Sequence, residues 1–124
     1  MEPSKNAIGT PLSPCSLDPM TGWYRDGCCN TDENDRGSHT VCAQVTQEFL
    51  EFLQSRGNDL ITPAPHFNFP GLKAGDRWCV CAASWLQAYH QGVACPVNLL
   101  STHARALDIV PLDFLMEYSI AIND

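Results

Sequence analysis

GDRWCVCAASWLQAYHQG, residues 75–92, is the most distinctive part of this chain, with two of its three tryptophans and two of its seven cysteines. Asp76 is suited to cap the first turn of a helix, and Gly92 is suited to end it. Large side chains recur between them at helical spacing: Trp78, Ala82, Trp85, Leu86 and Tyr89. The pattern predicts one amphipathic helix at the centre of the core, with residues 23–29 packed against it.

Two cysteines lie inside this expected helix. Residues two apart on a helix point to different sides, so Cys79 and Cys81 are not expected to bind one metal ion there. Cys81 flanks the tryptophan face and is expected to be a small buried side chain. Cys79 lies near the expected N-terminus of the helix, where the helix dipole lowers the pKa of a thiol. Cys79 is therefore the better candidate for chemistry.

Length and charge limit the classes of function. The chain has 124 residues, enough for one cysteine-rich domain, which we expect to span residues 9–124 after a flexible tail of residues 1–8. Its net charge of -7 argues against nucleic acid and membrane as partners, because both are polyanions. The expected partner is a small molecule or another protein.

The expected compartment follows from two further features. No apolar run approaches the ~20 residues of a membrane span, and the first residues lack an apolar signal core. We therefore expect a cytoplasmic protein, in which thiols stay reduced and structural disulfides do not form. Seven cysteines in such a protein favour metal binding or redox chemistry.

A second helix is predicted over residues 41–56, ended by Gly57. Thr46 is a candidate N-cap, although the apolar face extends back to Cys42. Short strands are expected at residues 23–25, 59–62 and 96–100, a short helix capped by Thr102 at 103–108, and a last helix at 111–118. The predicted fold class is α+β, a small single domain with a few helices packed on a short sheet and long ordered loops.

Several runs of residues together resemble one protein family. They are DPMTGWYRDGCC (residues 18–29), HTVCA (39–43), GNDL (57–60), FPGL (69–72), GDRWCVCA (75–82) and the pair Thr102-His103. In this order they are similar to an uncharacterised bacterial and plant family, domain of unknown function 2237. The resemblance implies no activity, cofactor or mechanism. It implies a set of motif residues, namely Cys28, Cys29, His39, Cys42, Cys79, Cys81 and His103, and Cys15 also falls in a matching stretch.

The first functional hypothesis is a redox or nucleophilic thiol. Such a thiol needs a helix N-terminus or a cation that stabilises its thiolate, and a second thiol within reach. The candidates for the reactive thiol are Cys28, Cys29 and Cys79, with Arg25 and Arg77 as supporting cations. A bond between the adjacent Cys28 and Cys29 would close a strained ring, so any disulfide is expected to be long-range.

The second hypothesis is a zinc or iron site. Zinc is commonly held by about four Cys or His donors in a tetrahedron. The tentative ligands are Cys28, Cys29, His39, Cys42 and His103. The chain has no CxxC pair, which leaves this site without the usual spacing signal.

The third hypothesis is a binding or structural module whose cysteines belong to the core. The sequence has no G-x-S-x-G, Walker or G-x-G-x-x-G motif, so hydrolase and nucleotide-enzyme signatures are absent. A ligand of such a module is expected at the loop of residues 63–73, which carries His66, Phe67 and Phe69.

Overall fold

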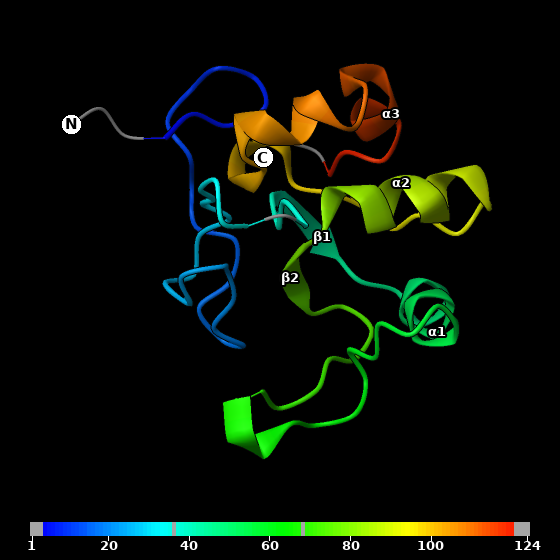
Figure 1. The fold of residues 1–124 in the computed structure, drawn as a ribbon. Helices are drawn as coiled ribbons and strands as arrows, with labels where there is room; N and C mark the ends of the chain where they lie inside the picture. Colours follow the sequence, from blue (N-terminus) through cyan, green and yellow to red (C-terminus); the bar gives the residue numbers. More distant parts are fainter. Residues whose placement is uncertain (1–3, 36, 68, 121–124) are drawn as a thin grey trace.

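A short antiparallel sheet lies at the centre of the computed structural model, which describes residues 4–35, 37–67 and 69–120. The sheet pairs β1 (Val41–Gln44) with β2 (Arg77–Val80). Within it Cys42 lies opposite Cys79, and Ala43 lies opposite Trp78. Figure 1 shows the two strands between the helices and the long loops of the first forty residues.

Three α-helices complete the domain (Figure 1). Helix α1 (Gln47–Ser55) follows β1 after a short turn, and α2 (Ala82–His90) follows β2 directly. Helix α3 (Leu112–Glu117) closes the described chain. Short 3-10 helices occupy Pro65–Phe67, Leu99–Ser101 and Ala104–Asp108. This arrangement confirms the predicted α+β class.

The single helix predicted over residues 75–92 is wrong in its first half. Trp78 and Val80 enter one buried cluster while Cys79 enters another, which is the two-residue alternation of a strand. Asp76 caps no helix, and its carboxylate instead accepts a hydrogen bond from the Lys73 amide. The helical half of the prediction holds, and Gly92 follows α2 with the positive φ of 76° expected of a stop residue.

The helix predicted over residues 41–56 also begins too early. Its first four residues form β1, because pairing with β2 satisfies their backbone groups. The helix itself begins after Thr46, whose hydroxyl accepts a hydrogen bond from the Phe49 amide at 3.2 Å. Thr46 is therefore the N-cap, as predicted.

The short strands expected from the sequence are not formed, because these segments make no more than an isolated bridge to a neighbouring strand. Residues 23–25 form a turn and residues 59–62 an irregular loop, so neither expected strand is present. The segment 96–100 contributes an isolated bridge at Val97 followed by a 3-10 helix. The 3-10 helix Ala104–Asp108 is capped by His103 rather than Thr102, because the His103 ring accepts a hydrogen bond from the Arg105 amide.

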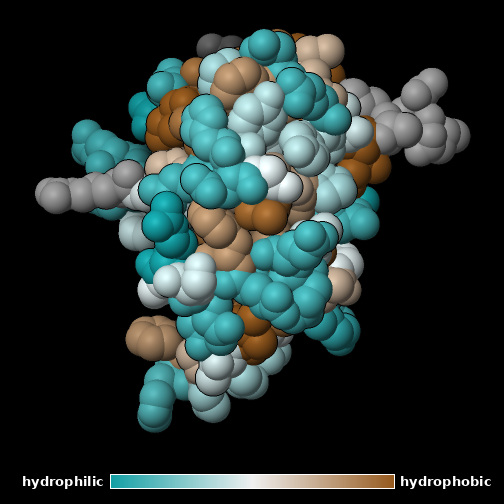
Figure 2. All heavy atoms as spheres, turned by 90° about the vertical axis from the view of Figure 1, so that its right-hand side faces the viewer, coloured by the Kyte–Doolittle hydropathy of each residue, from teal (hydrophilic) through white to brown (hydrophobic). Residues whose placement is uncertain are grey.

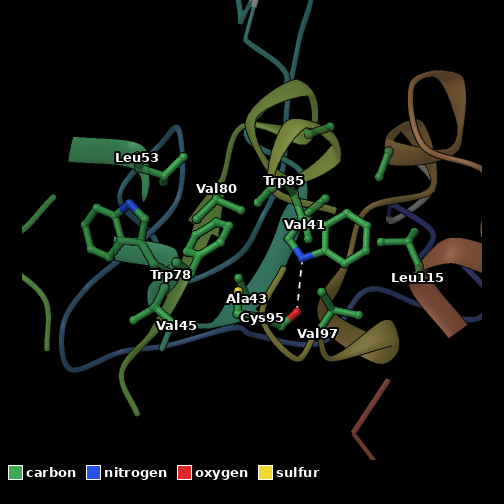
Figure 3. Packing of buried hydrophobic residues seen from close by; sticks show 14 of the residues in the cluster. Val41, Ala43, Val45, Leu53, Trp78, Val80, Trp85, Cys95, Val97 and Leu115 are labelled. Carbon is green, nitrogen blue, oxygen red and sulfur yellow. Dashed lines mark hydrogen bonds between the residues drawn. The ribbon is translucent and has the colours of Figure 1, made fainter. Parts of the chain in front are cut away.

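The sheet separates two buried clusters. One face carries Val41, Ala43, Trp78 and Val80, which pack with helices α1 and α2 in the hydrophobic core. Figure 3 shows Trp85 of α2 in this core, where its indole N–H donates to the Cys95 carbonyl at 3.1 Å. The opposite face carries Cys42 and Cys79, which belong to a cluster of four cysteines.

Residues near the start of the described chain pack on the rest of the domain. Asn6 and Ala7 are buried, and the Asn6 amide donates to the carbonyls of Pro11 and Leu100. These contacts join Asn6 to the segment before Thr102.

The outer surface is mainly polar on the side formed by the helices. Figure 2 shows this face, with apolar side chains in separate patches among hydrophilic ones. Among the residues described, no helix has the length and apolar character needed to cross a membrane.

Trp85 provides a test of the core. Trp85→Ala is expected to lower the free energy of unfolding by about 3–5 kcal/mol, because a fully buried indole is removed together with its hydrogen bond. Urea unfolding followed by circular dichroism measures the change. Trp23 is 43% exposed and serves as the matched control, with an expected loss of about 1 kcal/mol or less for Trp23→Ala. Equal losses in both variants would show that α2 does not organise the core.

Candidate functional site

Four cysteines, two from one loop and one from each strand, form a buried cluster. Cys15 is bonded to Cys42, and Cys29 is bonded to Cys79. The Sγ atoms of Cys15, Cys29 and Cys79 all lie within 4.8 Å of one another. The two disulfides are therefore neighbours in one buried cluster.

The sheet and one loop bring these cysteines together. Cys42 and Cys79 are opposite each other in the strand register, so their side chains lie on the same face. The loop that carries Cys15 and Cys29 is folded back on itself, because the Cys15 amide donates to the Gly27 carbonyl at 2.6 Å. Buried Thr21 then joins this loop to β2, as its hydroxyl accepts from the Cys79 amide at 2.8 Å.

The disulfides correct two expectations from the sequence. Reduced thiols were expected throughout, whereas four of the seven cysteines are paired. Cys79 was expected at a helix N-terminus, whereas it lies in a strand and carries no free thiol. The expectation of reduced thiols failed because it rested on the inferred compartment and not on the cysteines themselves. Both bonds are long-range, with partners 27 and 50 residues apart, as expected of any disulfide in this chain.

A cleft of about 390 Å³ opens beside the cluster. Cys79 is part of its lining, although the residue is only 2% exposed, and its partner Cys29 is fully buried. Aromatic side chains make up much of the wall: Trp23, Phe67, Phe69 and Trp78. Arg25, His39 and Asp59 supply the titratable groups.

His39 is held in the cleft wall by a buried carboxylate. Its Nδ1 lies 2.6 Å from Asp35 Oδ1, and its backbone amide donates to Asp35 Oδ2 at 2.9 Å. Trp23 stacks on the imidazole with ring centroids 5.9 Å apart. Burial alone would raise the pKa of Asp35, but hydrogen bonds from His39 and Thr31 outweigh it and hold that pKa below its ordinary value. An ionised Asp35 therefore fixes the ring through Nδ1, and among the described residues Nε2 has no hydrogen-bond partner.

The three remaining cysteines are free thiols. Cys28 is half-buried, and burial together with the nearby Asp26 raises its pKa. Cys81 is the N-cap residue of α2 and is also half-buried. Cys95 lies in the core, where burial raises the pKa of its thiol. Cys28 therefore remains a candidate nucleophile on sequence grounds only, because its surroundings disfavour the thiolate form.

The tentative metal ligands are only partly brought together. Cys29 and Cys42 meet Cys15 and Cys79 in the cluster. Cys28, His39 and His103 lie outside the one group of metal-binding side chains found among residues 4–35, 37–67 and 69–120. The His103 Nδ1 accepts the Arg105 amide, and burial, followed by the charge of Arg105, lowers the pKa of this ring. His103 therefore acts as a helix cap.

Sequence reasoning did not select Cys15, Thr21 or Asp35 for the site. Cys15 lies within a stretch of the family resemblance, which was a usable signal. The alternation of apolar residues with cysteine in VCA and WCV was a second one, because it is typical of strands that place cysteines on one face. Nothing in the polar run of residues 30–35 distinguishes the one carboxylate that becomes buried.

Comparison with protein families agrees with the motifs that surround this site. Residues 5–119 match the family described as "Uncharacterized protein conserved in bacteria (DUF2237)". The chain belongs to this family. The matched region includes all four clustered cysteines and every residue that lines the cleft. A search of curated proteins finds no match.

Asp35 provides a test of the His39 pair. Asp35→Asn is expected to lower the free energy of unfolding at pH 7 by about 1–3 kcal/mol, because a buried carboxylate that accepts several hydrogen bonds is replaced by a poorer acceptor. The native pKa lies below the ordinary value of 3.8, so this stabilisation is present above about pH 4 and is lost as pH falls through the native pKa. Urea unfolding from pH 7 down to pH 3 measures the difference.

The matched control for this variant is Asp108→Asn, because Asp108 is exposed. Its effect on stability is expected to stay within about 0.5 kcal/mol at each pH. A cost for Asp35→Asn that stays constant down to pH 3 would contradict the assigned role of the carboxylate.

Proposed function

We propose that this protein is a thiol–disulfide redox protein whose reactive bond is Cys29–Cys79. One observation carries the proposal: Cys79 lines an open cleft, whereas its partner Cys29 is fully buried. A thiolate that enters the cleft therefore reaches Cys79 before Cys29. This assignment keeps two of the three thiols that the sequence favours.

The exchange proceeds in two balanced steps. A thiolate of a dithiol substrate attacks Cys79 Sγ along the cleft, a substrate–Cys79 disulfide forms, and the electron pair of the broken bond leaves on Cys29 Sγ. The second substrate thiolate then attacks its own sulfur in that mixed disulfide and releases Cys79 as a thiolate. The substrate is oxidised by two electrons and the protein disulfide is reduced, with two protons transferred to the new thiols.

The second disulfide extends this chemistry inward. Cys29 Sγ lies within 4.8 Å of Cys15 Sγ, so a Cys29 thiolate can attack the Cys15–Cys42 bond. A Cys15–Cys29 disulfide forms in that step, and Cys42 leaves as the thiolate. Reducing equivalents that enter from the cleft thereby reach the Cys15–Cys42 bond, whose cysteines do not line the cleft.

Cations near Cys79 support the approach of an anionic thiolate. Arg25 lines the same cleft. Arg77 lies two residues before Cys79 on β2, and residues two apart on a strand point to the same face. Positive charge beside an attacking or leaving thiolate lowers the energy of that ion.

A redox titration tests the proposal. The folded protein is equilibrated with mixtures of reduced and oxidised dithiothreitol at pH 7, quenched with acid, labelled with a maleimide and mapped by peptide. Cys29 and Cys79 are expected to become labelled at potentials above about -300 mV, the range of labile rather than structural disulfides. Tryptophan fluorescence recorded on the same samples is expected to show an intact fold.

Paired variants separate the two disulfides. Cys15→Ser/Cys42→Ser keeps the bond at the cleft and is expected to react with dithiothreitol at a similar rate. Cys29→Ser/Cys79→Ser keeps only the Cys15–Cys42 bond, which lies outside the cleft lining. This variant is expected to react with dithiothreitol at least about tenfold more slowly, because access to the sulfur atoms controls the rate of exchange. If the cleft disulfide is reduced only below that potential, or only when fluorescence reports unfolding, both disulfides are structural and the proposal is wrong.

Zinc binding by the reduced cluster is a second candidate function. The observation in its favour is the convergence of three Sγ atoms within 4.8 Å, with Cys42 joined to the group through Cys15. Four buried thiolates match the donor set of a closed structural zinc site, and iron is a further ion that such a set accepts. This proposed donor set shares Cys29 and Cys42 with the ligands expected from the sequence, which were Cys28, Cys29, His39, Cys42 and His103.

Metal analysis decides this candidate. Protein reduced with a phosphine, loaded with zinc and dialysed is expected to retain about one ion per chain by elemental analysis, and Cys15→Ser is expected to lose it. His39→Ala and His103→Ala serve as controls and are expected to retain it, because neither histidine lies in the cluster. Retention by Cys15→Ser, or metal-free wild-type protein, would rule out a zinc site in the cluster.

A further inference from the structure

We propose that the cleft beside the cysteine cluster is a binding site for a planar aromatic molecule that carries one anionic group. The proposal rests on the walls of the cleft and on its uncommitted charge. It is independent of the redox chemistry proposed above, because it concerns the protein with both disulfides intact.

The walls provide flat apolar surface that neighbouring side chains cover only in part, with His39 stacked on Trp23 and Arg25 over Trp78. Trp23 is 43% exposed and Phe67 is 72% exposed, so two large rings face solvent at the rim. Phe69 and Trp78 lie deeper and meet edge to face, with centroids 5.1 Å apart. Aromatic walls favour stacking on a planar ligand, and covering the exposed rings adds hydrophobic free energy.

The volume of the cleft sets the size of the ligand. At about 390 Å³ it lies at the lower end of the range of small-molecule sites, which is about 300–1,000 Å³. A ligand of one or two fused rings fits this space. The loop that supplies Phe67 and Phe69 is the one that the sequence marks for a ligand in the binding-module hypothesis.

Arg25 supplies a cation that is available for a ligand. Its guanidinium lies over the Trp78 ring, 5.3 Å from the centroid. In the part of the chain that the structure describes, no carboxylate lies within ion-pair distance of it. The residue holds a positive φ of 54°, a backbone conformation that non-glycine residues rarely adopt and that is common at ligand clamps. A free cation in this position is notable in a chain with a net charge of -7.

The carboxylate of Asp59, in the same wall, is hydrogen-bonded to the backbone. Asp59 Oδ1 accepts the amides of Ile61 and Thr62 at 2.9 and 3.0 Å. Hydrogen bonds from Thr62 and Ile61 lower the pKa of Asp59, so this group stays ionised as part of the local turn. This carboxylate keeps its negative charge but is engaged by backbone amides, so Arg25 is the group in the wall that can pair with an anion.

His39 adds a second polar contact. Asp35 holds its Nδ1, and His39 lines the cleft, so its other nitrogen is the one left to bind a ligand. An anionic oxygen between the Arg25 guanidinium and this imidazole would receive charge-assisted hydrogen bonds while the attached ring stacks on the aromatic wall. The geometry thus favours an aromatic acid over its neutral counterpart.

Isothermal titration calorimetry with three matched probes tests the proposal: naphthoate, naphthyl phosphate and neutral naphthamide. One or both anions are expected to bind at least tenfold more tightly than the amide, since a charge-assisted hydrogen bond contributes a factor of about ten or more. Tighter binding of naphthoate identifies carboxylates as the ligand class, and tighter binding of the phosphate identifies phosphate esters. Equal affinity for the anions and the amide would overturn the proposal, as would no binding at millimolar concentration.

Variants locate the site. Arg25→Asn removes the charge with a residue that tolerates positive φ, and it is expected to weaken anion binding about tenfold or more. Arg56→Asn is the matched control, because Arg56 also lies 5.3 Å over an aromatic ring, that of Phe52, outside the cleft. Phe67→Ala is expected to weaken all three probes several-fold with little loss of stability. Unchanged binding in Arg25→Asn, or equal losses in both arginine variants, would exclude this site.

Discussion

The alternation of side chains across two four-residue strands is the constraint on which this structure depends. Because successive residues point to opposite faces, the same strands send valine, alanine and tryptophan into the hydrophobic core and cysteine into a second cluster. A pair of strands this short is only marginally stable by itself. Helices that pack on one face and disulfides that join loops to the other supply the missing stabilisation, and the chemistry of the site follows from that division.

Much of the architecture was accessible from local sequence patterns. The α+β class, the family, the Thr46 cap and the stop at Gly92 are all confirmed. The beginning of the central helix was wrong because Trp78 and Trp85 share a helical spacing by coincidence, while the competing strand signal spans only Arg77–Val80. Strand pairing is a non-local interaction, and a single sequence contains no direct measure of it.

The candidate site was predictable in its chemistry but not in its geometry. Cysteine richness and motif positions indicated Cys29 and Cys79, yet the pairing of these two residues depends on a loop closed by hydrogen bonds from Cys15 to Gly27. Asp35 could not be selected, because the carboxylates around it in the same polar run have the same local sequence character. Its role arises from burial beside His39, which only the folded backbone creates.

The two threonines beside the cysteine pair have a consequence for how this domain meets other proteins. Thr21 accepts the outward amide of Cys79, and Thr102 accepts the outward amide of Cys42 at 3.1 Å. Each strand of a two-stranded sheet is an edge, and a free edge is a template for pairing with a strand of another molecule. Side-chain hydroxyls occupy that template at the middle of both strands, and backbone hydrogen bonds with Pro96 and Asn98 cover the outer edge of β1 as well. A strand of another molecule would have to displace these contacts before it could pair with the sheet.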